Sequence, residues 1–279
     1  MNVKLLLKAF FYHHIFIAFC ALALCWQTFV LLHKTAANNH LYFFVFFATL
    51  LSYNTHFFLA AQKSTSSVQL RWFHQTKKFT LIFNSLVLAA TLYYFYHLRE
   101  ISSYIILAVV FNAAYTAPLL FKTTLKIPLV FTFVKSYFIG IIWVFATGIL
   151  PLFLIKQQLG LLEIAILLHR FLLVSIATLI FDYRDKLRDY ELGVHTPANK
   201  MNEHQFHWFF IFNLFLMAGS VVFLFLSTNE LVQWFQLVPC GFLWWAFLKS
   251  KKRTDDLFYL TLVDGALFLS AILSIFLLI

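Results

Sequence analysis

Long apolar runs separated by short polar segments follow one another along the whole chain. A helix needs about 20 apolar residues to cross the hydrocarbon layer of a bilayer. Nine segments approach that length, at residues 10–32, 41–61, 79–98, 104–120, 128–154, 161–181, 208–226, 231–248 and 257–279. The pattern predicts an all-α integral membrane protein with nine transmembrane helices in one bundle.

The composition supports one membrane-embedded domain over residues 1–279. Hydrophobic residues make up 62% of the chain and charged residues 11%, whereas soluble domains carry about 25% charged residues. The polar segments are too short to form a separate soluble domain. The first apolar run continues to about Leu32, which is too long for the core of a signal peptide, so we interpret it as a retained first span.

Lysine and arginine predict the orientation of the spans. With the N-terminus placed in the cytoplasm, sixteen of the 21 basic residues fall on the inner side, and only Lys34, Arg99 and Lys156 fall outside. This bias predicts a multi-pass protein of the cell (inner, cytoplasmic) membrane with a cytoplasmic N-terminus. The net charge of +10 then reflects topology and contact with anionic membrane lipids, and requires no nucleic acid partner.

Three carboxylates stand together where the sixth apolar run ends, in the sequence FDYRDKLRDYELGVHTP. Asp182, Asp185 and Asp189 are spaced i, i+3 and i+7. If the helix continues past Phe181, they share one face with neighbours about 5–6 Å apart. Such a set suits Mg²⁺, which takes one or two carboxylates together with substrate phosphates. The alternative is a solvated helix end of alternating charge.

Basic groups on the same predicted inner side suit an anionic ligand. The sequence YTAPLLFKTTLK at the end of the fourth run contains Tyr115, Lys122 and Lys126, and Arg184 lies between two of the aspartates. Lysine and arginine bind phosphate oxygens through charge-assisted hydrogen bonds. The alternative for the lysines is that they reach from a span end to the membrane surface. After the aspartates, TPANK is typical of a turn, and we expect Pro197 to prevent a helix there.

These motifs resemble the UbiA-type intramembrane prenyltransferases. The resemblance rests on the pattern D-x-x-D-x-x-x-D after the sixth of nine spans and on Y-x-x-P-x-x-x-K at the end of the fourth, and it covers nearly the whole chain. It implies transfer of a prenyl group from an allylic (poly)prenyl diphosphate to an aromatic or other lipid-soluble acceptor, assisted by Mg²⁺. It also implies that Asp182, Asp185 and Asp189 are catalytic metal ligands.

The first aspartate motif of that family, N-D-x-x-D-x-x-x-D, is degenerate here. Residues 54–62 read NTHFFLAAQ, so Asn54 is kept while Thr55, Phe58 and Gln62 replace the aspartates. Two interpretations remain open. In the first, the protein is a transferase in which Asn54, Tyr115, Lys122, Lys126 and Arg184 bind the diphosphate. In the second, it is a non-catalytic relative that binds a polyprenyl lipid or a partner protein.

Three charged residues fall inside predicted spans. Lys135 and Asp264 each lie seven residues from the inner end of their segments, at a depth of about 10 Å. Charges in the membrane usually face the bundle interior and have a partner, so the two residues are predicted to pair. Arg170 lies deeper, and the sequence does not indicate its partner.

The charge pattern makes a testable prediction about topology. In a variant without the three native cysteines, single cysteines are introduced near Lys200 and near Asn38 and exposed to a membrane-impermeant thiol reagent. We expect labelling from outside near Asn38 and protection near Lys200. Labelling of both positions from outside would contradict the nine-span arrangement.

Overall fold

A bundle of long helices forms the protein. The computed structural model describes residues 3–33, 39–120, 129–191 and 194–277. Within that part of the chain, seven helices are long and apolar enough to cross a membrane, or eight if the bent pair α1 and α2 forms one span. An all-helical, multi-pass membrane protein is therefore confirmed, while the count of nine spans stays a prediction.

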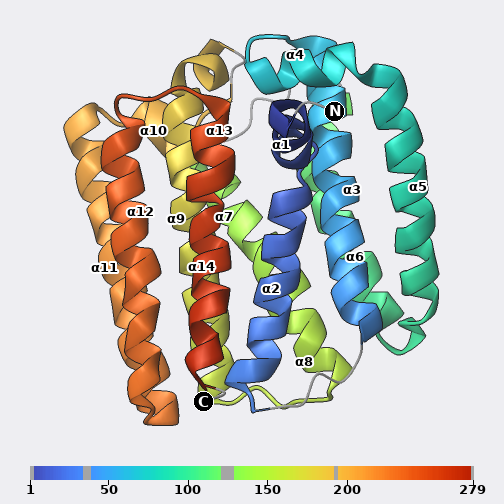
Figure 1. The fold of residues 1–279 in the computed structure, drawn as a ribbon. Helices are drawn as coiled ribbons and strands as arrows, with labels where there is room; N and C mark the ends of the chain where they lie inside the picture. The colour runs from blue at the N-terminus through green and yellow to red at the C-terminus, as the bar shows by residue number, and fades with distance from the viewer. Residues whose placement is uncertain (1–2, 34–38, 121–128, 192–193, 278–279) are drawn as a thin grey trace.

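Each of the nine predicted segments contains a helix of the bundle (Figure 1). These helices are α2 (Ile15–Leu31), α3 (Asn39–Lys63), α5 (Lys77–Tyr96), α6 (Ser102–Leu120), α7 (Leu129–Val144), α9 (Leu161–Glu191), α11 (Glu203–Thr228), α12 (Leu237–Ser250) and α14 (Gly265–Leu273). The other α-helices are α1 (Val3–Tyr12), α4 (Val68–Gln75), α8 (Leu150–Leu154), α10 (Pro197–Lys200) and α13 (Asp256–Phe258). Helical turns η1 (Arg99–Ile101), η3 (Leu231–Gln236) and η5 (Ser274–Leu277) and the π-helical turns η2 (Phe145–Ile149) and η4 (Tyr259–Val263) complete the chain.

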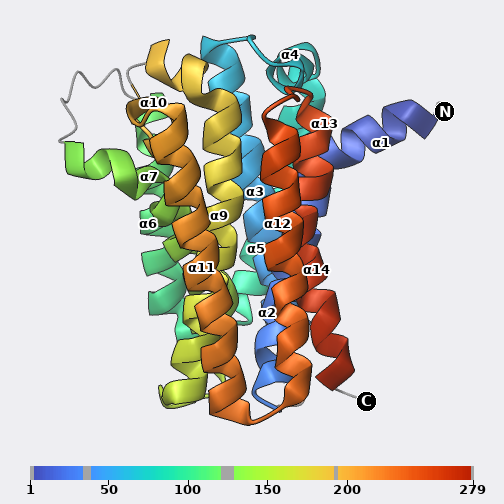
Figure 2. The same cartoon turned by 90° about the vertical axis from the view of Figure 1, so that its left-hand side faces the viewer.

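The short helices α4, α10 and α13 lie at one end of the bundle, opposite the end near the C-terminus (Figures 1 and 2). The sequence predicts the connections that contain these helices to share the cytoplasmic side, and the fold does bring them to the same end. The side of the membrane that this end faces stays a prediction. Pro197 does not prevent a helix as expected, because it stands at the first position of α10, where proline needs no hydrogen-bond acceptor.

Helix α9 is the centre of the packing. It is the most buried of the candidate spans, and residues 172–180 are buried on every side. A helix that is apolar all round is typical of the interior of a large bundle. It packs against α7 and α11, whereas α5 is the least buried candidate span. The end of α9 therefore has a fixed position relative to the helices around it.

The first span is broken between α1 and α2, which meet at an angle of 53°. His14 has φ 59° at the break, a left-handed conformation that is uncommon outside glycine. Two side-chain amides bind carbonyl groups at this break. Gln69 Nε2 donates to Tyr12 O at 3.2 Å, and Asn54 Nδ2 donates to His13 O at 2.8 Å. These bonds satisfy backbone groups that lipid cannot.

Arg170 finds its partners in neutral oxygens. Its side chain is 1% exposed, and its guanidinium donates to Thr28 Oγ1 at 2.5 Å, Thr147 O at 2.6 Å and Gln27 Oε1 at 2.8 Å. The Thr147 carbonyl lies four residues before Pro151, which has no N–H to offer it. The arginine thus binds a carbonyl that the helix itself leaves without its usual donor.

Removal of one oxygen from this cluster is expected to destabilise the bundle. Gln27→Leu keeps the side-chain volume but leaves Arg170 Nη2 without that acceptor, at a cost of about 1–3 kcal/mol. The apparent melting temperature in lipid nanodiscs should fall accordingly. Gln75→Leu, at an exposed position of α4, is the matched control and should change it little. Equal effects of the two substitutions would contradict this account of Arg170.

Candidate functional site

The aspartate cluster lies on the last turns of α9. The helix continues past Phe181 to Glu191, which is the condition under which the three aspartates share one face. Asp182 and Asp189 are each 4% exposed, and the side chain of Asp185 is 16% exposed. The cluster is therefore a buried part of the bundle end, and a fully solvated helix end is the wrong description for it.

Two arginines on the same helix bind Asp185. Arg184 donates from Nε to Oδ1 at 2.8 Å and from Nη2 to Oδ2 at 3.0 Å, and Arg188 Nη2 donates to Oδ2 at 2.6 Å. The Arg184 side chain is only 8% exposed. A guanidinium that binds both oxygens of a carboxylate forms one of the strongest protein ion pairs. The charge of Asp185 is therefore compensated within the chain.

The other two aspartates have partners of a different kind. Asp182 accepts a hydrogen bond from Ser136 Oγ, which joins α9 to α7. Asp189 Oδ1 lies 3.8 Å from Arg188 Nη2. In the described part of the chain, no group of three or more His, Cys, Asp or Glu side chains is arranged to hold a metal ion. The three aspartates as a metal and catalytic site stay a prediction.

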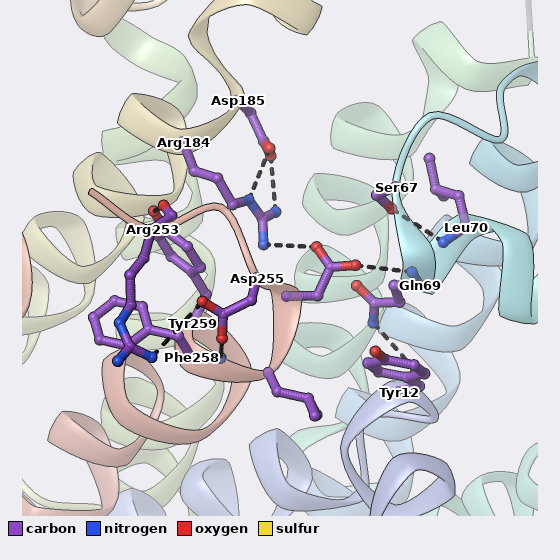
Figure 3. A network of polar contacts seen from close by, with 12 residues as sticks. Tyr12, Ser67, Gln69, Leu70, Arg184, Asp185, Arg253, Asp255, Phe258 and Tyr259 are labelled. Carbon is purple, nitrogen blue, oxygen red and sulfur yellow. Dashed lines mark hydrogen bonds and ion pairs between the residues drawn. The ribbon is translucent and has the colours of Figure 1, made fainter. Parts of the chain in front are cut away.

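Arg184 also joins α9 to the opposite side of the bundle end (Figure 3). Its Nη1 lies 3.4 Å from Asp256 Oδ1, and its guanidinium lies 4.8 Å from the centre of the Tyr259 ring. Asp256 in turn accepts from the backbone N–H of Gln69 at 2.8 Å. Because Gln69 also binds the break between α1 and α2, one chain of polar contacts links α9, α13, α4 and the broken span.

Asn54 occupies the position of the degenerate first motif and is fully buried. Its amide nitrogen donates to His13 O and to Leu50 O at 2.9 Å, and its Oδ1 lies 3.3 Å from His13 Nδ1. Trp72 Nε1 donates to His13 Nε2 at 3.1 Å, so the hydrogen of that imidazole lies on Nδ1 and points to Asn54. The polar atoms of Asn54 are thus engaged in the helix break, and its role with diphosphate stays a prediction.

Of the remaining predicted residues, the structure describes the side chains of Tyr115 and Asp264 but not those of the three lysines. Tyr115 is half-buried on α6, and its ring stacks on His56 with 5.2 Å between the centroids. Lys122 and Lys126 lie outside the described residues, as does the side chain of Lys135. Asp264 is 8% exposed between η4 and α14. The predicted pair of Lys135 and Asp264 therefore lies beyond what the structure describes.

The sequence interpretation missed Gln69 and Asp256, which complete the polar network. The sequence contains a helix-capping residue close to each of them. Ser67 precedes an amphipathic stretch and caps α4 by accepting from Leu70 N at 3.1 Å. Asp255 and Asp256 follow a basic run, and Asp255 caps α13 by accepting from Phe258 N at 3.2 Å. Capping residues of this kind mark helix starts in a sequence.

The whole fold resembles that of known membrane enzymes. No protein-family model and no curated protein matches the sequence. The arrangement of helices, however, resembles that of a solved membrane enzyme, which agrees with the fold that the resemblance in the sequence implies. One similar solved structure is that of digeranylgeranylglyceryl phosphate synthase in membranes, with 13% sequence identity and a TM-score of 0.52. The match covers 95% of this chain and 96% of that one, so the two share a fold throughout.

The arginine–aspartate pair at the end of α9 should be strongly coupled. A double-mutant cycle with Arg184→Met and Asp185→Asn is expected to give a coupling energy of about 1–3 kcal/mol, because both side chains are largely withdrawn from water. Lys186 and Glu203, 3.5 Å apart with 35% and 54% of their side chains exposed, provide the control cycle. That pair should give about 0.5 kcal/mol or less. The coupling energies are measured by unfolding in mixed micelles. Similar coupling energies for the two pairs would show that Arg184 and Asp185 interact no more strongly than an exposed ion pair.

Proposed function

We propose that the protein binds an allylic prenyl diphosphate at the bundle end where α9 finishes, and that it transfers the prenyl group to a lipid-soluble acceptor in the membrane. The observation that carries the proposal is the aspartate cluster of α9, set at the bundle end of a chain that shares its fold with a membrane prenyltransferase along 95% of its length. Its setting supports a ligand with a charged head and an apolar tail.

A transferase of this kind must stabilise the negative charge of the leaving diphosphate. It carries roughly three negative charges, and uncompensated charge is costly in a site of low dielectric constant. Arg184 and Arg188 are the described cations beside the aspartates, and Lys122 and Lys126 are the further predicted ones. In transfer, the bond between the allylic carbon and a diphosphate oxygen breaks and its electron pair leaves with the diphosphate. The acceptor forms a bond to that carbon and loses a proton. These cations stabilise the charge that the diphosphate gains.

The described residues do not fit the Mg²⁺ site that the resemblance implies. Both oxygens of Asp185 are bound by guanidinium groups, and Asn54 has a backbone-binding role in place of a metal carboxylate. A metal with two carboxylate clusters therefore has no counterpart in this arrangement. Dependence on Mg²⁺ stays a prediction that the binding experiment below tests directly.

A second candidate function follows from the same degenerate motif. Thr55, Phe58 and Gln62 carry no charge. Gln62 Oε1 accepts from Lys77 Nζ at 3.2 Å, and Gln62 Nε2 donates to Phe58 O at 3.3 Å. A site with less charge to stabilise a leaving group suits binding better than turnover. The alternative is thus a non-catalytic relative that binds a polyprenyl lipid or a partner protein.

Binding is tested with purified protein in lipid nanodiscs. Farnesyl or geranyl diphosphate should raise the melting temperature, because a ligand stabilises the state that it binds. The shift is measured with Mg²⁺ and with a chelator, and it should vanish in Asp185→Asn. Asp255→Asn is the matched control, since Asp255 has a side chain that is 55% exposed and asparagine caps a helix equally well. Equal shifts in both variants would place the ligand elsewhere.

Turnover separates the two candidate functions. The protein is incubated with an allylic diphosphate and a panel of lipid-soluble acceptors, and release of diphosphate is followed. Release that is lost in Asp185→Ala and reduced in Lys122→Ala supports a transferase. Binding without any release above the Asp185→Ala background supports the non-catalytic relative.

A further inference from the structure

Helix α1 stands apart from the other helices of the bundle. It meets α2 at 53°, and Figure 2 shows it projecting from the side of the bundle, near the end that carries α4 and α13. Leu5, Leu6 and Leu7 are 50%, 45% and 53% exposed, so three consecutive leucines turn about half of their surface away from the protein. A helix with such side chains at the end of a membrane bundle is suited to the boundary between acyl chains and headgroups.

The charges of α1 favour an anionic partner. The helix has two charged residues, Lys4 and Lys8, and both are basic. Lys8 is exposed, and none of the ion pairs within the described part of the chain involves it. The exposed basic run at residues 251–253 lies just before α13, and Asp255 balances part of its charge, at 3.8 Å from Arg253.

A groove of about 260 Å³ lies between α1 and the start of the last span. Leu7, Lys8 and Phe11 of α1 form one wall, and Leu257 of α13 and Thr261 of η4 form the other. Thr261 Oγ1 donates to Leu257 O at 2.6 Å, so its hydroxyl group is satisfied within its own helical segment. The groove therefore offers apolar surface, with the cation of Lys8 in its wall.

The polar network described above holds the two walls of the groove in place. Asp256, beside Leu257, accepts from the N–H of Gln69 at 2.8 Å. Gln69 Nε2 donates to the carbonyl of Tyr12, beside Phe11, at 3.2 Å. A preformed groove loses little conformational freedom when it binds a ligand, which increases affinity. The groove thus favours a molecule that stays bound over lipids that only pass along the helices.

We propose that this groove binds one anionic glycerophospholipid of the surrounding bilayer, with an acyl chain along Leu7, Phe11 and Leu257 and the phosphate at Lys8. The apolar walls match an acyl chain, and an exposed lysine without a carboxylate partner matches an anionic headgroup. A second copy of this chain, with its net charge of +10, lacks that complementarity. The lipid does not react, so the inference is independent of the proposed transferase function.

The test uses the full chain in maltoside micelles, titrated with dioleoyl phosphatidylglycerol or dioleoyl phosphatidylcholine, and native mass spectrometry counts the lipids bound. The two lipids have the same acyl chains, but only phosphatidylglycerol has a net negative charge. The wild type should retain one phosphatidylglycerol about fivefold more tightly than phosphatidylcholine, as expected for one lysine beside an anionic headgroup. Glycerol phosphate, which has no acyl chain, should not compete for the groove.

Three variants locate the site. Lys8→Gln should bind the two lipids equally, because it keeps the groove and removes the charge. Leu7→Ser should weaken the binding of both lipids about three- to tenfold and keep the preference, because it removes apolar contact with the chain. Lys78→Gln, at an exposed position near the start of α5, is the matched control with the same loss of charge and should behave as the wild type.

Three results would overturn the inference. The first is equal affinity of the wild type for the two lipids. The second is a preference that persists unchanged in Lys8→Gln. The third is a loss of preference in Lys78→Gln as large as that in Lys8→Gln, which would mean that the lipid responds to the overall charge of the bundle end rather than to the groove.

Discussion

Every polar backbone group within the membrane needs a partner inside the protein, and the arrangement of this bundle depends on that requirement. The chain departs from regular helix where it can meet the requirement with side chains. At the break between α1 and α2, amides of Gln69 and Asn54 bind the carbonyls of Tyr12 and His13. Before Pro151, the guanidinium of Arg170 binds the carbonyl of Thr147. Each irregularity is therefore tied to a distant helix.

The same requirement shapes the candidate site. Gln69 contributes its side chain to the helix break and its backbone N–H to Asp256, which in turn lies beside Arg184. The break of the first span and the end of α9 thus belong to one polar network. Asn54 matches the asparagine of the motif that the sequence resembles, and in this structure its amide binds the His13 carbonyl. A structural role thus accounts for this asparagine without the carboxylates of that motif.

The sequence predicted what depends on local pattern. Apolar runs located the helices of the bundle, and α9 does extend through Asp182, Asp185 and Asp189, as a shared face for these residues requires. It did not reveal partners that depend on packing. Arg184 and Asp256 are 72 positions apart, and nothing local joins them. Arg170 was expected to need a partner of its own, yet its described partners are uncharged oxygens, which are too common in a sequence to stand out.

Arg170 and Asp264, the two span charges whose side chains the structure describes, have different surroundings. Oxygens from α2 and η2 surround the Arg170 guanidinium, so the fold itself solvates that cation. The carboxylate of Asp264 has no comparable donors in the part of the chain that the structure describes. Polar groups inside a membrane bundle that the protein leaves unsolvated are stable only when a ligand or a proton completes them. Arg170 is therefore explained by the architecture of the bundle, in which a side chain of one helix completes the backbone of another.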